Sequence, residues 1–288
     1  MEEKLMEEKL LYKGKVKDVY DLNDKLKFKF SNRISVFDQI IPSEIKVKGE
    51  VLCRIAKFWF EKVEERKICK THYIPDDICK NNEMIVKKTK VIPLEFILRH
   101  YNAGSYYKRN GGKYGEKLPE PVFEITTKFE KYDRLLTEDE ALKISKLKKH
   151  DLEYIKETIL KIDDLIHEEI DKRGLIHVDG KKEFGLLNGE ILLIDTFGTP
   201  DEDRFWDKNE YEKGNIVELS KEFVRKHYEN LMFVCPKCNE KFSYRDFLYA
   251  QREAKLQEPL IPPLPDEKVK EVENLYKTMY ERITGMKF

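Results

Sequence analysis

The sequence predicts an α+β fold in which an antiparallel, β-rich N-terminal part precedes a larger mixed part. Three observations lead to this. Residues 10–92 are dominated by period-two alternation, residues 137–173 carry helical periodicity, and a second alternating segment spans Ile176–Asp195. A chain of 288 residues can also bury a substantial core, which we expect to be divided between two lobes.

The strands of the N-terminal part are predicted from alternation and turn residues. Leu11–Tyr20 and Lys25–Ser31 alternate around Asn23 and Asp24, which predicts a hairpin. Glu83–Thr89 reads as a further strand, and we expect the second lobe to begin at Val91.

The predicted helices have clear periodic or terminal signals. Glu50–Glu65 carries apolar residues at helical spacing, and Thr137 with Glu140 has the form of a capping box. Pro259–Pro265 is expected to separate the last two helices. The stripe expected to be buried in the 137–173 region consists of Ile155, Ile159, Ile162 and Ile166.

Composition limits the classes of partner. Lys plus Arg and Asp plus Glu both number 55, so no overall field favours nucleic acid or a membrane surface. No apolar run has the length of a membrane span and the N-terminus does not resemble a signal peptide, so a cytoplasmic protein is expected. A charged fraction of 38% with abundant Lys and Glu suggests a thermophilic source. The repeated MEEKL leaves Met1 or Met6 as the start.

Five cysteines do not suggest a disulfide framework. Cys53, Cys69 and Cys79 are expected to be small buried hydrophobic residues. Cys235 and Cys238 form a Cys-Pro-Lys-Cys pair that resembles half of a zinc knuckle, and distant cysteines or a second subunit would have to complete four ligands. The alternative is a pair that binds no metal.

Residues 91–105, VIPLEFILRHYNAGS, are the most informative stretch. Glu95 and Arg99 are followed by a small turn at Gly104 and Ser105, a combination suited to a phosphorylated metabolite because Arg contacts phosphate bidentately and Ser adds a hydroxyl. The alternative is a helix on which Glu95 and Arg99 form an i,i+4 pair.

Lys13, Lys15 and Lys17 surround Gly14 in a predicted strand pair. A flexible glycine among cations suits a segment that covers nucleotide phosphates. A solvated, lysine-rich sheet edge would have the same composition.

In the predicted hairpin, Asp179, Lys181 and Glu183 alternate and therefore share one face. A two-residue turn at Asn188-Gly189 would place Asp195 on the wrong face. We therefore predict a three-residue loop, which pairs Lys181 with Asp195 and separates an apolar face from a charged one. Carboxylates around a lysine suit a Mg²⁺–phosphate site; the alternative is a ladder of salt bridges.

The stretch at 91–105 resembles the first signature of the SAICAR synthetase (phosphoribosylaminoimidazole-succinocarboxamide synthase) family. Further similar segments follow in the family's order, and they are LLYKGKVKDVYDL, SNRISVFDQIIPSEIKVKGEVLCRIAKFWFEKV, KLPEPVFEITTK, GLIHVDGKKEFG, LIDTFGTPDEDRFW and the tail PPLPDEKV…YERITG. The resemblance implies a two-lobed fold with a kinase-like or ATP-grasp-like nucleotide cleft. It also implies ATP-dependent ligation of L-aspartate to carboxyaminoimidazole ribonucleotide (CAIR) with Mg²⁺, by a monomer or homo-oligomer.

The resemblance also implies roles for individual residues. Lys181, Glu183 and Asp195 match the catalytic positions, with Glu183 and Asp195 as metal ligands. The ATP side is matched by Lys13, Lys15, Lys17 and either Lys87 or Lys88, because neighbours on a strand face opposite ways. Substrate positions are matched by Asp38, Glu95, Arg99, Ser105, Lys128, Asp133, Asp179 and Arg204.

The chain departs from the family at three positions of this region, because Gly180 replaces a larger residue, Lys182 an apolar one and Thr196 a common Glu. We expect an ATP-binding lobe at 1–90, a substrate and metal lobe at 91–230 and a helical segment at 231–288. A small-molecule kinase with a similar nucleotide site is the alternative enzyme. A metal-dependent interaction module built on Cys235 and Cys238 is the non-enzymatic one.

Overall fold

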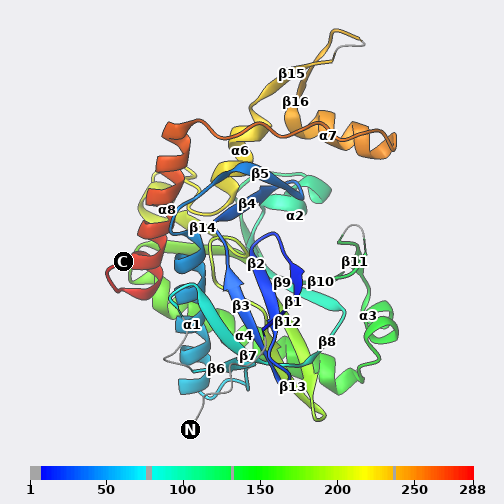
Figure 1. Cartoon of the computed structure of the whole chain (residues 1–288), viewed down its shortest axis with the longest axis vertical. Coiled ribbons are helices and arrows are strands. Elements are labelled where there is room, and N and C mark those ends of the chain that lie inside the picture. The colour runs from blue at the N-terminus through cyan, green and yellow to red at the C-terminus, as the bar shows by residue number, and fades with distance from the viewer. Residues whose placement is uncertain (1–7, 76–79, 131–132, 236–237) are drawn as a thin grey trace.

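The computed structural model describes residues 8–75, 80–130, 133–235 and 238–288 (Figure 1). It confirms the α+β class, with mainly antiparallel sheets and helices packed against them. The alternative start at Met6 and the burial expected for Cys79 lie outside the described residues. No helix in the described ranges is both long enough and apolar enough to cross a membrane.

The first sheet has five strands in the order β1-β2-β3-β7-β6. They span Lys9–Lys13, Lys17–Asp21, Lys25–Phe30, Glu83–Lys87 and Tyr73–Ile74, respectively. The predicted turn at Asn23-Asp24 and the predicted strand at Glu83 are confirmed. The single strand predicted for Leu11–Tyr20 is wrong, because the chain reverses at Gly14 and β1 pairs with β2. Period-two alternation continues across this tight turn and therefore gave no signal of it.

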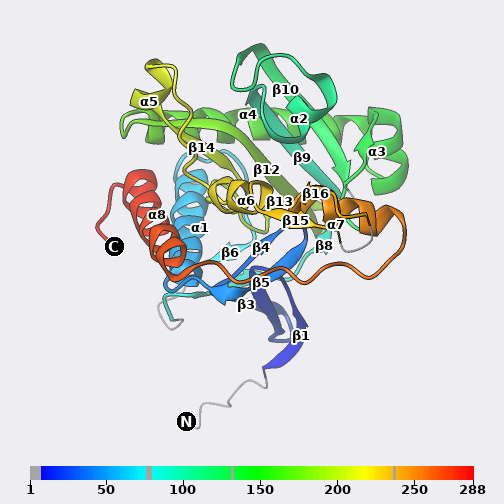
Figure 2. The same cartoon turned by 90° about the horizontal axis from the view of Figure 1, so that it is seen from above.

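Helix α1, Lys48–Glu65, packs against the first sheet with the predicted apolar face buried. The C-terminal helix α8, Asp266–Thr284, lies beside α1 and also contacts α4, as Figures 1 and 2 both show. The short hairpin of β4, Arg33–Val36, and β5, Gln39–Glu44, precedes α1. The last helix in the sequence is therefore part of the main core.

The second sheet has seven strands and is built around the long strand β12, Leu175–Leu187. Its main order is β11-β10-β9-β12-β13, and β8 and β14 also pair with β12. The other strands, in chain order from β8 to β14, are Lys90–Val91, Leu94–Tyr101, Lys117–Thr127, Leu135–Leu136, Glu190–Ile194 and Arg204–Asp207.

Two predicted helices, α3 at Glu138–Ser145 and α4 at Lys149–Asp171, are confirmed. Thr137 and Glu140 form the predicted capping box. Helix α4 packs against β12, and its predicted isoleucine stripe is fully buried. The remaining elements are α2, Gly104–Asn110; α5, Lys208–Glu212; α6, Glu222–Glu229; β15, Met232–Val234; β16, Lys241–Ser243; and α7, Tyr244–Glu253. The proline-rich segment separates α7 from α8 as predicted, and the β15–β16 hairpin projects from the body in Figure 1.

The loop between β13 and β14 is held in place by α1. The indole Nε1 of Trp59 donates a hydrogen bond to the carbonyl of Gly198 at 2.9 Å, and Trp59 is fully buried. Further along the loop, the Lys48 ammonium lies 2.9 Å from the Asp201 carboxylate, and both side chains are buried. Because this loop leads into Arg204, helix α1 determines where that side chain emerges.

Gly198 allows this close approach, which gives a test of the loop anchor. Its φ is +64°, and a Cβ at this position would lie 2.4 Å from Trp59 Nε1. We expect Gly198→Ala to lower the free energy of unfolding by about 3 kcal/mol, because backbone strain adds to a steric clash. Urea denaturation would measure the loss.

Gly214→Ala is the matched control, because Gly214 has a φ of +87° but nothing within 4 Å of the added methyl group. We expect it to lose only about 1 kcal/mol, the cost of the left-handed backbone. Equal losses in the two variants would show that contact with Trp59 does not constrain the loop.

Candidate functional site

The candidate site lies on one face of the second sheet, where three neighbouring strands present polar side chains at alternate positions. The register pairs Arg99 of β9 with Asp179 of β12, and Glu95 of β9 with Thr126 of β10. Because directly paired residues point to the same side of a sheet, Glu95 and Arg99 share this face with Asp179 and Lys181. The helical alternative for Glu95 and Arg99 is wrong, since both belong to a strand.

The predicted register of the β12–β13 hairpin is wrong, although its predicted face is correct. Glu183 pairs with Ile194, and the connection is the two-residue turn Asn188-Gly189. Both turn residues have positive φ, at +52° and +84°, as a type I′ turn requires. In this register, strict alternation along β13 would turn Asp195 away from Glu183.

Asp195 nevertheless reaches the site because it lies just beyond the end of β13 and leaves the strand conformation. Its φ is +63°, so the alternation of side chains no longer holds there. The Asp195 carboxylate pairs with the ammonium of Lys17, and its Oδ2 lies 4.0 Å from Lys128 Nζ. The Asp195 carboxylate therefore lies between Lys17 of β2 and Lys128, which directly follows β10.

Four arginines and three carboxylates form a continuous alternating chain across this face. Arg99 donates from Nε to Glu124 Oε2 at 2.8 Å and from Nη1 to Asp179 Oδ2 at 2.8 Å. Arg204 donates to the same Asp179 oxygen and, at 3.2 Å, to Glu222 Oε2. The complete order is Arg109–Glu124–Arg99–Asp179–Arg204–Glu222–Arg225. This arginine chain has one more cation than anions, which favours binding of an anion.

Ser105 and Arg204 add further donors to this arginine chain. The Ser105 hydroxyl accepts from Arg99 Nη2 at 3.0 Å, so its own proton can point elsewhere. Arg204 Nε is buried and has no hydrogen-bond partner among the described residues. A buried donor without a partner is costly, and a bound oxyanion would satisfy it.

Arg204 also lines a small pocket of about 50 Å³. The other charged residues of its lining are the cations Lys221 and Arg225 and the five carboxylates Asp179, Asp201, Glu202, Asp203 and Glu222. A larger hollow of about 620 Å³ has a mainly apolar lining that includes Leu98, Phe123 and Leu160. No guanidinium group lines the larger hollow, whereas Arg204 and Arg225 both line the smaller pocket.

A second group of charges, the lysine–carboxylate cluster, lies at the other end of the same face. Lys181 Nζ is 2.7 Å from Glu95 Oε1, 2.8 Å from Glu183 Oε1 and 3.5 Å from Glu202 Oε2. Lys128 pairs with Glu183 and lies 4.0 Å from Glu95 Oε1. The members are Lys17, Lys128, Lys181, Glu95, Glu183, Asp195 and Glu202, so this cluster has one more anion than cations.

Within the lysine–carboxylate cluster, the pKa of Glu95 is raised and the pKa of Asp195 is lowered. Burial raises the pKa of Glu95 to about 7, and the charge of Glu183 adds to the rise while Lys181 opposes it. Burial alone would also raise the pKa of Asp195, but Lys17 and Lys128 lower it well below the ordinary value. Near neutral pH, Asp195 is therefore fully charged, whereas Glu95 is only partly ionised.

Four of the lysines predicted to bind the nucleotide lie outside the lysine–carboxylate cluster, and they are Lys13, Lys15, Lys87 and Lys88. Lys15 pairs with Asp38, and Lys13 is exposed on β1. Lys87 donates to the Thr71 carbonyl at 3.0 Å, whereas Lys88 pairs with Asp21 at an exposed position. Of all the lysines predicted to bind the nucleotide, only Lys17 forms an ion pair within the lysine–carboxylate cluster.

Asp38 and Asp133 lie at the margin of the lysine–carboxylate cluster. The pKa of Asp133 is raised by burial, and its charge interacts with Lys181 and Lys128. Burial acts to raise the pKa of Asp38, but the neighbouring Lys15 holds it below the ordinary value.

Sequence reasoning missed Arg109, Glu124, Glu202, Glu222 and Arg225. The alternation of β10 gave a signal for Glu124, because it lies two residues from Thr126 on the same face. The other four lie on a loop and on the short helices α2 and α6, where the sequence gave no signal of side-chain direction. Their positions required the tertiary structure.

The Cys235–Cys238 pair lies at the β15–β16 hairpin, away from the lysine–carboxylate cluster and the arginine chain (Figure 1). Within the described ranges, no group of three or more potential ligands includes either thiol. Zinc at this pair therefore stays a prediction. Cys53 is buried as expected, and Cys69 is only partly buried.

Comparison of the sequence with known proteins identifies a family. The family model described as SAICAR synthetase matches residues 10–241. The phosphoribosylaminoimidazole-succinocarboxamide synthase of Thermoplasma acidophilum is 52% identical, over 97% of this chain and 100% of the relative. The enzyme of the same name from Nitrosopumilus maritimus is 33% identical, over 96% and 98%.

Solved structures agree with this assignment. A SAICAR synthetase in complex with ADP has a TM-score of 0.71 and 28% identity, covering 96% of this chain and 98% of its own. The SAICAR synthase of Saccharomyces cerevisiae complexed with SAICAR has a TM-score of 0.71 and 25% identity, covering 97% and 95%. The chain therefore belongs to the SAICAR synthetase family of ligases.

Proposed function

We propose that the protein ligates L-aspartate to the carboxylate of CAIR with consumption of ATP, giving SAICAR, ADP and phosphate. Membership of the family supports the ligation, and relatives solved with ADP and with SAICAR support a nucleotide and a ribonucleotide as ligands. The two oppositely biased charge groups on one sheet face give these ligands separate binding positions.

The chemical problem is that a carboxylate is a poor electrophile. Transfer of the ATP γ-phosphoryl group to CAIR gives an acyl phosphate, and the amine of aspartate then displaces phosphate. Such a transfer depends on positioning and neutralisation of charge more than on a covalent nucleophile of the protein. The lysines, arginines and carboxylates of this site can perform both tasks.

The ribonucleotide phosphate is assigned to the arginine chain. The single observation that carries this assignment is the buried, unpartnered Nε of Arg204 beside the small pocket. Arg99 and the Ser105 hydroxyl complete a set of donors, and the net positive charge of the arginine chain balances part of the phosphate charge.

Mg²⁺ and the ATP phosphates are assigned to the lysine–carboxylate cluster. The donor set fits Mg²⁺, because Glu95, Glu183 and Asp195 offer hard carboxylate oxygens around one point, and the Lys128 ammonium lies among them. Glu183 and Asp195 would hold the ion, which would neutralise phosphate charge. Lys17 and Lys181 would contact phosphate oxygens, with Lys13, Lys15, Lys87 or Lys88 as further cations on the ATP side.

The margin of the cluster is assigned to the remaining substrate groups. Asp38 and Asp133 at the margin, together with Lys128 from within the cluster, would face CAIR or the amino acid. In this arrangement residues 1–90 contribute most of the nucleotide lobe, residues 91–230 the substrate lobe and residues 231–288 a helical segment against both.

Phosphate release tests the reaction directly. The ligase requires ATP, CAIR and L-aspartate together, whereas a small-molecule kinase would turn over with one acceptor alone. With ATP and CAIR but no aspartate, hydroxylamine should trap an acyl phosphate as the hydroxamate. Turnover without aspartate, giving a stable phosphorylated product, would favour the kinase.

Arg204→Gln tests the ribonucleotide site. Loss of a buried bidentate donor should cost about 2–4 kcal/mol in CAIR binding, a rise in KM on the order of 30- to 1000-fold, with little change in the KM for ATP. Steady-state kinetics would measure both constants. The control is Arg134→Gln, which removes an exposed guanidinium whose ion pairs among the described residues are with Glu130 and Glu140. A similar loss of ATP and CAIR affinity would assign Arg204 to the nucleotide or to structure.

Asp195→Asn tests the metal assignment. The substitution preserves shape but removes one unit of ligand charge, so kcat should fall and part of it should return at high Mg²⁺ concentration. The control is Asp171→Asn, which changes an exposed carboxylate paired with Lys208. An active Asp195→Asn enzyme with normal Mg²⁺ dependence would remove Asp195 from the metal site.

Glu95→Gln tests the charge state of the ligand-free site. The folded-state pKa of Glu95, about 7, exceeds the ordinary value of 4.5, so its proton stabilises the fold at low pH and this contribution is lost as pH rises toward 7. The free energy of unfolding of Glu95→Gln, relative to wild type, should therefore increase between pH 5 and 7.5, by on the order of 2 kcal/mol. Urea titrations across this range would measure it, and a constant difference would refute the shift.

A further inference from the structure

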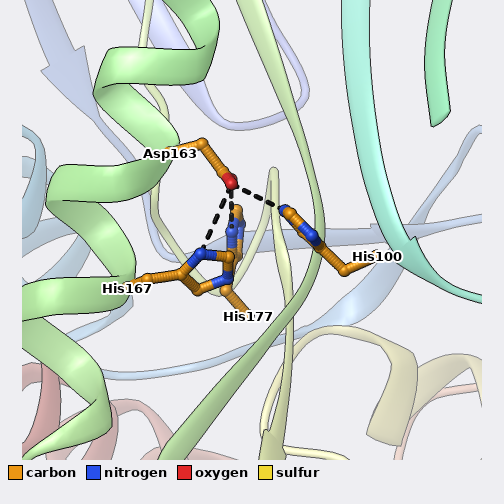
Figure 3. Close-up of side chains that lie close together, drawn as sticks. All are labelled: His100, Asp163, His167 and His177. Atoms are coloured by element: carbon orange, nitrogen blue, oxygen red, sulfur yellow. Dashed lines mark hydrogen bonds and ion pairs between the residues drawn. The ribbon is translucent and has the colours of Figure 1, made fainter. Parts of the chain in front are cut away.

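A cluster of three histidines and one aspartate lies behind the candidate site, on the side of β9 and β12 that faces helix α4 (Figure 3). His100 comes from β9, Asp163 and His167 come from α4, and His177 comes from β12. We call these four residues the histidine cluster. One ligand atom from each lies within 4.8 Å of the others.

Asp163 is at the centre of the histidine cluster, and Figure 3 shows the three rings directed toward its carboxylate. Its oxygens lie 2.6 Å from His100 Nε2, 3.0 Å from His177 Nδ1 and 3.4 Å from His167 Nδ1. Bonds of about 2.0–2.1 Å to a tetrahedral zinc ion place ligand atoms about 3.3 Å apart. Small side-chain rotations would therefore suffice to enclose an ion.

The backbone positions of these ligands suit a metal centre. Asp163 and His167 are four residues apart on α4 and so project from the same helix face. His100 alternates with Arg99 on β9, which directs it to the face opposite the arginines. Asp163 and His177 are buried, whereas the His167 side chain is 38% exposed and provides an access path.

A second layer of charged groups orients His177. Its Nε2 lies 2.8 Å from Asp203 Oδ2, and the Lys182 ammonium lies 3.3 Å from the same oxygen. A carboxylate on the outer nitrogen of a histidine is the usual arrangement behind a metal ligand, because it directs the other nitrogen toward the ion. Asp203 contacts Nε2 of His177, so Nδ1 of His177 is directed at Asp163.

Gly180 makes room for this second layer. A Cβ at Gly180 would lie 2.1 Å from Asp203 Oδ2 and 2.7 Å from His177 Nε2. The glycine and Lys182, both departures from the family pattern in the sequence, therefore belong to one arrangement. Both residues accommodate the buried Asp203–His177 contact, which Gly180 leaves room for and Lys182 neutralises.

The charge balance accommodates a cation. Burial opposes the charged form of His177, but its hydrogen bonds to Asp163 and Asp203 raise its pKa, so without a metal a protonated His177 balances the charge of Asp163. Metal ligation requires neutral imidazoles, and because Asp203 and Lys182 neutralise one another, the ion would then take over this balancing role. Burying the charge of Asp163 is costly unless a cation accompanies it. Imidazole and carboxylate ligands together suit zinc and related divalent ions.

We propose that the histidine cluster is a structural site for a zinc-type divalent metal, with His100, Asp163, His167 and His177 as its four ligands. Because His100 follows Arg99, and Asp203 precedes Arg204, the bound ion would fix the backbone beneath both arginines. The competing arrangement has the same contacts without metal, with a protonated His177 between Asp163 and Asp203.

Metal binding to the whole protein distinguishes these accounts without any measurement of ligase activity. The protein would carry Cys235→Ser and Cys238→Ser, so that this thiol pair contributes no metal binding, and would be stripped with a chelator. Co²⁺ titration followed by visible absorption should show one equivalent bound in a tetrahedral field, with Zn²⁺ displacing it. Zn²⁺ should also raise the midpoint of thermal unfolding.

Variants in the same background locate the ion. His167→Ala removes the partly exposed ligand and should weaken Co²⁺ binding at least tenfold, and Asp203→Asn should weaken it about 10- to 100-fold. His150→Ala is the control, because this histidine is 70% exposed and lies outside the cluster. Absence of a tetrahedral cobalt spectrum in the parent protein, or equal Co²⁺ affinity in His167→Ala and His150→Ala, would overturn the proposal.

Discussion

The arginine chain is the interaction on which the rest of the site depends. Buried charges persist only when each has a partner, and here every carboxylate lies between two guanidinium groups. Asp179 has the central position, because it joins Arg99 on β9 to Arg204 at the start of β14. Loss of either arginine would therefore alter a strand junction as well as an anion site. Because the arginine chain begins with Arg109 and ends with Arg225, it has one more positive than negative charge.

The opposite bias of the lysine–carboxylate cluster explains how one sheet face can receive ligands of different charge. Each group has three members on β9, β10 and β12: Arg99, Glu124 and Asp179 in the arginine chain, and Glu95, Lys181 and Glu183 in the lysine–carboxylate cluster. The two sets are separated along these strands, and the remaining members come from neighbouring helices, loops and strands. Lys17, Lys128 and Lys181 together neutralise most of the local carboxylate charge. Under the proposed function, Mg²⁺ and phosphate would exchange one set of ion pairs for another at a site whose charged groups are already in place.

Strand β12 connects three parts of the molecule because its two faces have different roles. One face presents Asp179, Lys181 and Glu183 to the candidate site, and the other presents Lys182 to the β13–β14 loop. His177 contacts α4 on this second face because the register shifts between His177 and Asp179. Trp59 of α1 fixes that loop through the Gly198 carbonyl, so packing in the first lobe contributes to the position of Arg204 in the second. Because the two faces of β12 have different roles, residues on the face toward α4 can depart from the family pattern, as Gly180 and Lys182 do. The other face still carries Asp179, Lys181 and Glu183.

The sequence by itself determined the elements with strong periodicity, the charged face of β12 and the family. Alternation predicted which residues of β12 share a face, and the Thr137 capping box predicted where α3 begins, because both depend on local geometry. The hairpin register was wrong because alternation assumes that a strand continues, whereas Asp195 lies just past its end with a positive φ. Only the tertiary structure decided which lysine reaches Asp195, how the arginines alternate with carboxylates, and that three histidines meet at Asp163. These contacts join residues far apart in the sequence, and no local period encodes the distance between them.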